Sequence, residues 1–367
     1  MRRQIRNLGK AEPCGNEIKI TFTRANPWFG AALMLLNLTE VEERTRTQLP
    51  GWNDATLKFS VIEKGGSGRI FVRAQNLDLG ESVIAMHYSD ERTDNLRFAD
   101  VTDFLNRHQI PAPGVIDRRL AENLLWVEDL GEQDLGDLAG SDWDSVRRPA
   151  YESALRAVFQ LHQISEVAAP SDLPELEISF DETLYRWEQE YFIHQFVERF
   201  LPEGLAPDLL ADESLKSLAG SLAGIPRTLL HRDFQSTNVM MIDGEAFLID
   251  YQGLRWGLPE YDLASLVYDP YTEFSVEERE YLIRYYFLLG KEAGVGSELD
   301  EFSDRLARCA MQRLMQALGA YGFLSEVKGK REFLEHIPTA QGRLKEIASS
   351  GAGLPVLAEA LCHSAEI

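Results

Sequence analysis

Four polar residues that could share one reaction centre lie between positions 231 and 250. His231 and Asp233 are separated by one residue, Asn238 follows five residues after Asp233, and Asp250 comes twelve residues after Asn238. A carboxylate can orient a hydroxyl group and accept its proton. A second carboxylate and an amide oxygen are the hard ligands that Mg²⁺ prefers. These residue types suit a centre with one base, Asp233, and two metal ligands, Asn238 and Asp250.

Transfer of a phosphoryl group from ATP needs these groups and little covalent help from the protein. The reaction requires a hydroxyl held in line, a carboxylate that takes its proton, and Mg²⁺ that neutralises the phosphate oxygens. A single Asp or His in a loop is more often a turn or capping residue. The interpretation therefore depends on the elements that surround the four residues.

A short β-hairpin is expected to bring the predicted metal ligands together. Residues 239–242 and 246–249 have the composition of two short strands, and an Asp-Gly turn joins them. Asn238 precedes the first strand and Asp250 follows the second, so the hairpin places them side by side. Asp233 lies on the loop before the hairpin and can then face the γ-phosphate.

The rest of the chain divides into a β-rich and a helical region. We predict an α+β, bilobal fold: residues 38–130 form a small β-rich N-lobe that binds nucleotide, and residues 131–367 form a mainly helical C-lobe with the catalytic loop and substrate site. Residues 1–37 form an N-terminal extension of unknown role. The expected elements are strands at 56–63, 69–75, 82–88, 123–128 and 229–230, and helices at 40–49, 94–108, 151–162, 181–200 and 302–323.

The loop and hairpin resemble the aminoglycoside-phosphotransferase family, a small-molecule branch of the protein-kinase fold. The resemblance extends from about Thr56 to about residue 345. It implies ATP and Mg²⁺, with Asp233 as catalytic base and His231 as a residue that positions the loop. Asp262, in Leu-Pro-Glu-Tyr-Asp-Leu-Ala, matches the family's acid after the metal-binding segment. We expect Asp262 to support the site and to cap the N-terminus of a helix.

The resemblance also implies nucleotide contacts in the N-lobe. A glycine-rich loop would close over the phosphates, Arg69 and Arg73 would supply positive charge, and the strand that enters the lobe connector would hydrogen-bond the adenine. Kinases usually place a lysine in the strand at 82–88, but here Met86 occupies that place. Either the arginines replace the lysine or the protein is an inactive homologue; the intact catalytic motif favours the first alternative. The predicted nucleotide-binding residues are Gly65, Gly66, Ser67, Gly68, Arg69, Arg73, Glu128 and Leu130.

The methionine-bearing strand is similar to that of cell-wall amino-sugar kinases, which phosphorylate the anomeric hydroxyl of N-acetylmuramate and N-acetylglucosamine. Further segments resemble these kinases at 127–131, 185–190, 230–238, 316–321 and 335–338. The resemblance implies a sugar substrate, for whose carboxylate Arg255 is a candidate. Two alternatives remain: a kinase for aminoglycosides or other alcohols, using acids such as Asp134, Asp137, Asp142 and Glu260, and a non-catalytic kinase-like binding module.

Composition restricts the partners of the protein. The 367 residues carry a formal net charge of −22, which repels nucleic acid and anionic lipid surfaces. The three cysteines are far apart, which argues against a disulfide framework or a zinc site and favours the cytoplasm. The longest apolar run, 28–36, is too short to span a bilayer. The sequence predicts neither a nucleic-acid nor a membrane partner and leaves the oligomeric state open.

Overall fold

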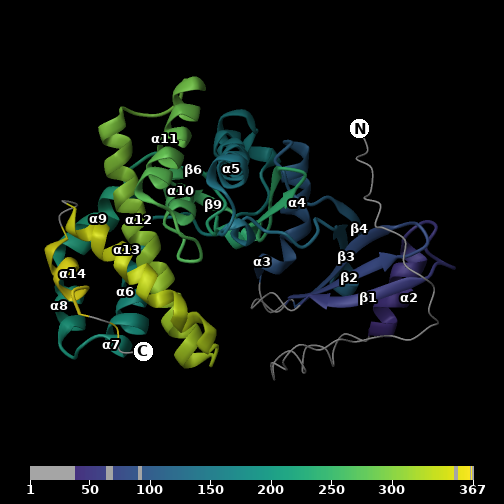
Figure 1. Ribbon diagram of the computed structural model, residues 1–367, viewed down its shortest axis with the longest axis horizontal. Helices are drawn as coiled ribbons and strands as arrows, with labels where there is room; N and C mark the ends of the chain where they lie inside the picture. Colours follow the sequence, from purple (N-terminus) through teal and green to yellow (C-terminus); the bar gives the residue numbers. More distant parts are fainter. Residues whose placement is uncertain (1–37, 63–68, 90–92, 351–353, 364, 366–367) are drawn as a thin grey trace. The chain divides into compact units, whose positions relative to one another are not determined.

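The computed structural model describes residues 38–62, 69–89, 93–350, 354–363 and 365 (Figure 1). The chain forms two compact units, the first ending at Gly131 and the second beginning at Glu132. A five-stranded sheet dominates the first unit and helices dominate the second. These observations confirm the predicted α+β fold class. Within the described residues, every helix is too short or too polar to cross a membrane.

The first unit is built on an antiparallel sheet with the strand order β1-β2-β3-β5-β4. The strands β2, β3 and β5 begin and end within two residues of the predicted positions. The described part of β1 also lies within its predicted range. The edge strand β4 was not predicted, because its half-exposed sequence Val-Ile-Asp-Arg-Arg lacks a clear alternation and it pairs with β5 through an irregular register. The elements are α2 (Leu38–Gln48), β1 (Leu57–Ile62), β2 (Arg69–Asn76), β3 (Glu81–Tyr88), α3 (Thr93–Leu96), α4 (Phe98–Arg107), β4 (Val115–Arg119) and β5 (Leu124–Glu128).

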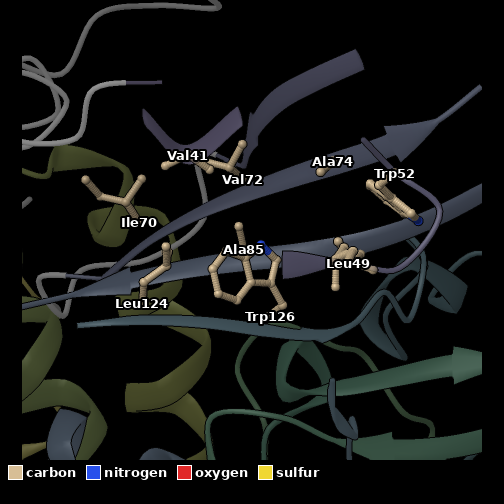
Figure 2. Packing of buried hydrophobic residues seen from close by; sticks show 10 residues of the cluster. Val41, Leu49, Trp52, Ile70, Val72, Ala74, Ala85, Leu124 and Trp126 are labelled. Carbon is tan, nitrogen blue, oxygen red and sulfur yellow. The ribbon is translucent and has the colours of Figure 1, made fainter. Parts of the chain in front are cut away.

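Helix α2 covers one face of this sheet. Val41 from α2, with Leu49 and Trp52 just beyond the helix, packs on buried side chains of β2, β3 and β5 (Figure 2). Trp126 of β5 is completely buried, and its indole Nε1 donates a hydrogen bond to Thr45 Oγ1 at 2.9 Å. A buried indole N–H needs such an acceptor, so this bond fixes the helix against the sheet. The strand residues of the cluster are Ile70, Val72, Ala74, Val83, Ala85, Leu124 and Trp126.

Met86, which replaces the expected lysine, lies on the other face of the sheet. Successive side chains of a strand point to opposite faces, and Ala85 belongs to the cluster under α2. Met86 stands opposite Phe71 of β2 and Leu125 of β5 and is completely buried. The side chain of Met86 is therefore packed in the apolar core on this face of the sheet and supplies no positive charge.

The second unit contains ten α-helices and two short antiparallel strand pairs among its described residues. The predicted helix at 181–200 is confirmed, because the chain is helical from Glu182 to Phe200, with a π-helical turn over Ile193–Val197 between α6 and α7. The strand β9 was not predicted and pairs with β6. The elements are α5 (Arg148–Val167), α6 (Glu182–Phe192), α7 (Glu198–Phe200), α8 (Leu205–Ala211), α9 (Glu213–Ala223), β6 (Thr228–Leu230), β7 (Val239–Ile242), β8 (Glu245–Leu248), β9 (Arg255–Gly257), α10 (Pro259–Val267), α11 (Val276–Glu292), α12 (Leu299–Gly322), α13 (Ile337–Ser349) and α14 (Pro355–Ala360).

Helix α12 is the central helix of the second unit and packs against α6, α10 and α13 (Figure 1). Two glycines permit its close approach to the α6 segment. A Cβ atom on Gly319 would lie 2.8 Å from Tyr191 Cδ1, and one on Gly322 would lie 2.0 Å from the carbonyl oxygen of Gln195. Any side chain at Gly322 would therefore separate the two segments.

Candidate active site

The hairpin β7–β8 has the predicted form. Val239 pairs with Leu248, and Ile249 N–H donates to the carbonyl oxygen of Asn238 at 3.0 Å. Asn238 and Asp250 therefore lie next to each other at the open end of the hairpin. Asp250 has a left-handed backbone (φ 61°, ψ 32°), a conformation that Asp tolerates better than most residues. The chain turns sharply there.

The two candidate metal ligands fit a hard cation by the chemistry of their donors. Asn238 Nδ2 donates to the carbonyl oxygen of Asp233 at 2.9 Å, which assigns the amide nitrogen and leaves Oδ1 as the acceptor atom. One carboxylate oxygen of Asp250 accepts from Gln252 Nε2 at 2.9 Å. An amide oxygen beside a carboxylate is a donor set that suits Mg²⁺.

Asp233 lies among guanidinium groups. Its Oδ2 accepts a charged hydrogen bond from Arg232, and its Oδ1 lies 3.9 Å from Arg313 Nη2. Burial alone would raise the pKa of Asp233, but the charges of Arg232 and Arg313 outweigh burial and hold this pKa below its ordinary value. The carboxyl side chain remains 27% exposed. Asp233 is thus an ionised carboxylate that an incoming hydroxyl can reach.

Asp262 supports the backbone in front of Asp233. Its carboxylate accepts hydrogen bonds from the backbone N–H groups of His231 at 2.7 Å and Arg232 at 2.8 Å. These bonds hold Arg232 in a left-handed conformation (φ 78°). The prediction that Asp262 caps a helix was wrong: α10 begins at Pro259, its N-cap is Leu258, and Asp262 lies inside the helix. The proline at the first helical position starts this helix without a side-chain cap.

Two histidines complete this support. His231 is buried, and its Nε2 donates to the carbonyl oxygen of Ile249 at 2.9 Å, which ties the catalytic loop to the end of β8. His162 of α5 lies between Asp262 (Nε2 to Oδ2, 3.0 Å) and the hydroxyl of Tyr286 (2.6 Å). In the sequence, His162 is only the last residue of the predicted helix at 151–162. Its contact with Asp262 depends on helix packing.

Asp269 is a second buried carboxylate that the sequence did not single out. It accepts hydrogen bonds from Ser236 N at 2.8 Å and Ser236 Oγ at 2.6 Å, in the middle of the catalytic loop. Burial raises the pKa of Asp269, against the opposing effect of these hydrogen bonds. Arg343 of α13 donates to the carbonyl oxygens of Asp269 and Thr272. Helix α13 therefore fixes the segment Asp269–Thr272, and Asp269 in turn fixes Ser236 of the catalytic loop.

Glu188, Tyr261 and Gln312 form a buried polar network near Arg232. Glu188 of α6 accepts from Tyr261 Oη at 3.2 Å and from Gln312 Nε2 at 3.1 Å. Burial raises the pKa of Glu188, and the charge of Arg232 opposes this effect. Arg255 lies over the ring of Phe180, with 5.4 Å from Cζ to the ring centroid. Arg313 and Glu188 were missed because the segments that carry them are remote in sequence from the loop.

The predicted nucleotide contacts lie in the first unit and stay predictions. Gly65, Gly66, Ser67 and Gly68 are outside the described residues. Arg69 lies over the ring of Phe71 at 6.0 Å. Glu128 ends β5, where its backbone N–H donates to the carbonyl oxygen of Gly114 at 2.9 Å, and Leu130 is buried.

Arg73 is held by the connector itself. It forms an ion pair of 2.7 Å with Asp129, whose side chain is only 5% exposed, and donates to the carbonyl oxygen of Gly131 at 2.8 Å. A guanidinium paired in this way has part of its charge neutralised. Replacement of the missing lysine by Arg73 would require this pair to open.

Comparisons with known proteins identify the family. The profile of the phosphotransferase enzyme family (APH) matches residues 58–298. Over 355 residues the chain is 24% identical to an N-acetylmuramate/N-acetylglucosamine kinase of Pseudomonas aeruginosa, covering 92% of this chain and 98% of that protein.

Solved structures agree on the fold. A choline kinase from Cryptosporidium parvum Iowa II superposes with a TM-score of 0.60 at 15% identity, covering 89% of this chain and 100% of that chain. An aminoglycoside 2′-phosphotransferase-IIIa variant in its GDP complex gives a TM-score of 0.60 at 13% identity, covering 84% and 98%. The family profile matches about two thirds of the sequence. The chain belongs to the aminoglycoside-phosphotransferase (APH) family of phosphotransferases and acts on an alcohol group.

Proposed function

We propose that this phosphotransferase moves the γ-phosphoryl group of ATP to the anomeric hydroxyl of N-acetylmuramate or N-acetylglucosamine, in cytoplasmic recycling of cell-wall sugars. The observation that carries the proposal is the reachable, ionised carboxylate of Asp233 beside Asn238 and Asp250. The sugar is inferred from the Pseudomonas aeruginosa relative, which matches over nearly its whole length.

The residues of the second unit divide the work of the reaction. Asp233 accepts a hydrogen bond from the acceptor hydroxyl, aims its oxygen at the phosphorus atom and takes the proton as the new bond forms. Asn238 Oδ1 and Asp250 would hold Mg²⁺, which, bound to ATP, neutralises the phosphate oxygens. Asp262 and His231 keep the loop in the conformation that presents Asp233. Because the pKa of Asp233 is low, its main contribution is orientation of the hydroxyl.

The arginines near Asp233 favour an uncharged or anionic acceptor over a polycation. An aminoglycoside needs a pocket of free carboxylates. Of the acids considered for that role, Glu260 pairs with Arg305 at 2.8 Å and Asp142 accepts from Ser145 N at 2.9 Å in a helical turn. Arg255 and Arg313 would instead attract the carboxylate of N-acetylmuramate. The family match and the complete motif argue against a binding module without catalysis.

The direct test is a survey of acceptors. ATP consumption is measured with N-acetylmuramate, N-acetylglucosamine, choline and several aminoglycosides, and the products of the sugars are assayed for their reducing end. Phosphorylation at the anomeric position removes the reducing end, so we expect ADP release and loss of reducing end in equal amounts. Turnover confined to choline or aminoglycosides would refute the sugar proposal.

Two substitutions test the assigned roles. Asp233→Asn keeps the size of the side chain and removes the negative charge that orients the hydroxyl and accepts its proton, so kcat should fall by about 10³-fold while Mg-ATP still binds. Asp250→Ala removes a metal ligand, so Mg-dependent binding of ATP should be lost. Calorimetry with Mg-ATP and steady-state kinetics separate the two effects. A variant Asp233→Asn with unchanged kcat would exclude Asp233 as the base.

A further inference from the structure

Helix α6 carries two aromatic side chains that stack face to face. Trp187 and Tyr191 are four residues apart, their ring centroids are 5.2 Å apart, and the angle between the ring planes is 9°. Residues at this spacing lie on the same face of a helix. Trp187 is 53% exposed, more than any other tryptophan in the described part of the chain. The two stacked rings together form an aromatic surface whose Trp187 side is open to water.

Tyr191 packs on α12 and on the turn that follows it. The ring of Tyr191 contacts the ring of Phe323 at 6.2 Å, and it lies so close to Gly319 that a Cβ atom there would approach Tyr191 Cδ1 to 2.8 Å. Tyr191 therefore rests directly on the backbone of α12, and Trp187 rests on Tyr191. Side chains fixed in this way lose little entropy when a ligand binds.

The same two helices carry side chains to the catalytic loop. On α6, Glu188 lies between Trp187 and Tyr191 in sequence and bonds to Gln312 of α12. The next residue of α12, Arg313, reaches within 3.9 Å of Asp233. Burial raises the pKa of Tyr191, and the charge of Arg232 acts against this rise. Tyr191 therefore lies within electrostatic range of Arg232, the neighbour of Asp233 in the catalytic loop.

We propose that Trp187 and Tyr191 form the acceptor subsite, an aromatic wall on which the C–H face of the sugar ring packs while its anomeric hydroxyl meets Asp233. This inference rests on the sugar-kinase function proposed above. A pyranose presents ring hydrogens on its broad faces and hydroxyls around its edge. A flat indole covers the apolar face and leaves the hydroxyls free for hydrogen bonds. The wall selects a ring over a flexible alcohol.

The test compares Trp187→Ala and Trp187→Phe with the control Leu288→Ala, which removes another exposed apolar side chain (44% exposed) from α11. For Trp187→Ala we expect the KM for N-acetylglucosamine to rise about tenfold, which is roughly 1.4 kcal/mol, with the KM for ATP unchanged. Trp187→Phe should recover most of the loss, and Leu288→Ala should match the wild type. Thermal melting of each variant checks the fold.

Intrinsic fluorescence gives a second readout that does not need turnover. Titration of Asp233→Asn with the sugar should change the Trp187 emission, and the change should disappear in the double variant with Trp187→Phe. A sugar KM unaltered in a folded Trp187→Ala, or an equal rise in the KM for ATP, would overturn the aromatic wall. If no sugar is phosphorylated by the wild type in the acceptor survey, the proposed function itself fails.

Discussion

Asp233 lies between two arginines, and this position determines the pH range in which its carboxylate can act. Burial tends to raise its pKa, whereas Arg232 and Arg313 lower it and prevail. An acid with a lowered pKa stays ionised further into the acidic range. The acid limb of the pH profile for kcat/KM should therefore lie below the ordinary range of an aspartate.

Arg313→Met should move this acid limb to higher pH, because the variant removes one of the two charges that lower the pKa of Asp233. Arg313→Lys keeps a positive charge and should leave the limb close to its original position. The measurement is kcat/KM against pH for the three proteins. Since Arg313 also contacts Ser265 and Gln316, a general loss of activity without a shift would point to structural damage and contradict the electrostatic role.

Replacing a glycine by alanine should have opposite effects on the free energy of unfolding in α12 and in α13. Gly322→Ala would place a Cβ atom 2.0 Å from the carbonyl oxygen of Gln195, so we expect the free energy of unfolding to fall by about 3 kcal/mol. Gly342 lies inside α13, and a Cβ atom there would contact nothing within 4 Å. Gly342→Ala should therefore stabilise the helix by about 0.5–1 kcal/mol.

Urea unfolding of the two variants checks this contrast, and each serves as the control for the other. Equal effects of both substitutions would show that helix propensity, and not the contact between α12 and the α6 segment, determines the outcome.

The elements that the sequence predicts best are those whose signal is local. The hairpin β7–β8 has an Asp-Gly turn between two apolar runs, and its flanking residues Asn238 and Asp250 follow directly from it. The three-residue strand β9 has no pattern of its own and exists because it pairs with β6. Asp269 and Arg313 reach the catalytic loop through the packing of α10 and α12, which periodicity does not specify.

The charge of the whole molecule is a separate source of instability. With 59 acidic and 37 basic residues, the folded chain concentrates a formal charge of −22, and compaction increases the repulsion among like charges. Salt screens this repulsion. We expect Tm to rise as NaCl is increased to about 0.5 M, as measured by circular dichroism. A Tm that stays constant or falls would show that surface ion pairs outweigh the repulsion.

The hydrogen bonds around Asp269 bear on how a truncated gene for this protein is interpreted. Arg343 is joined to the chain 107 residues after Ser236, yet it holds the carbonyl oxygens of the segment that anchors Ser236. A frameshift or stop codon between the codons of Asp269 and Arg343 would leave every motif residue from His231 to Asp269 in the translated product. Such an allele would still be expected to produce a protein with a poorly ordered catalytic loop, so an intact motif alone is a poor sign of a working gene.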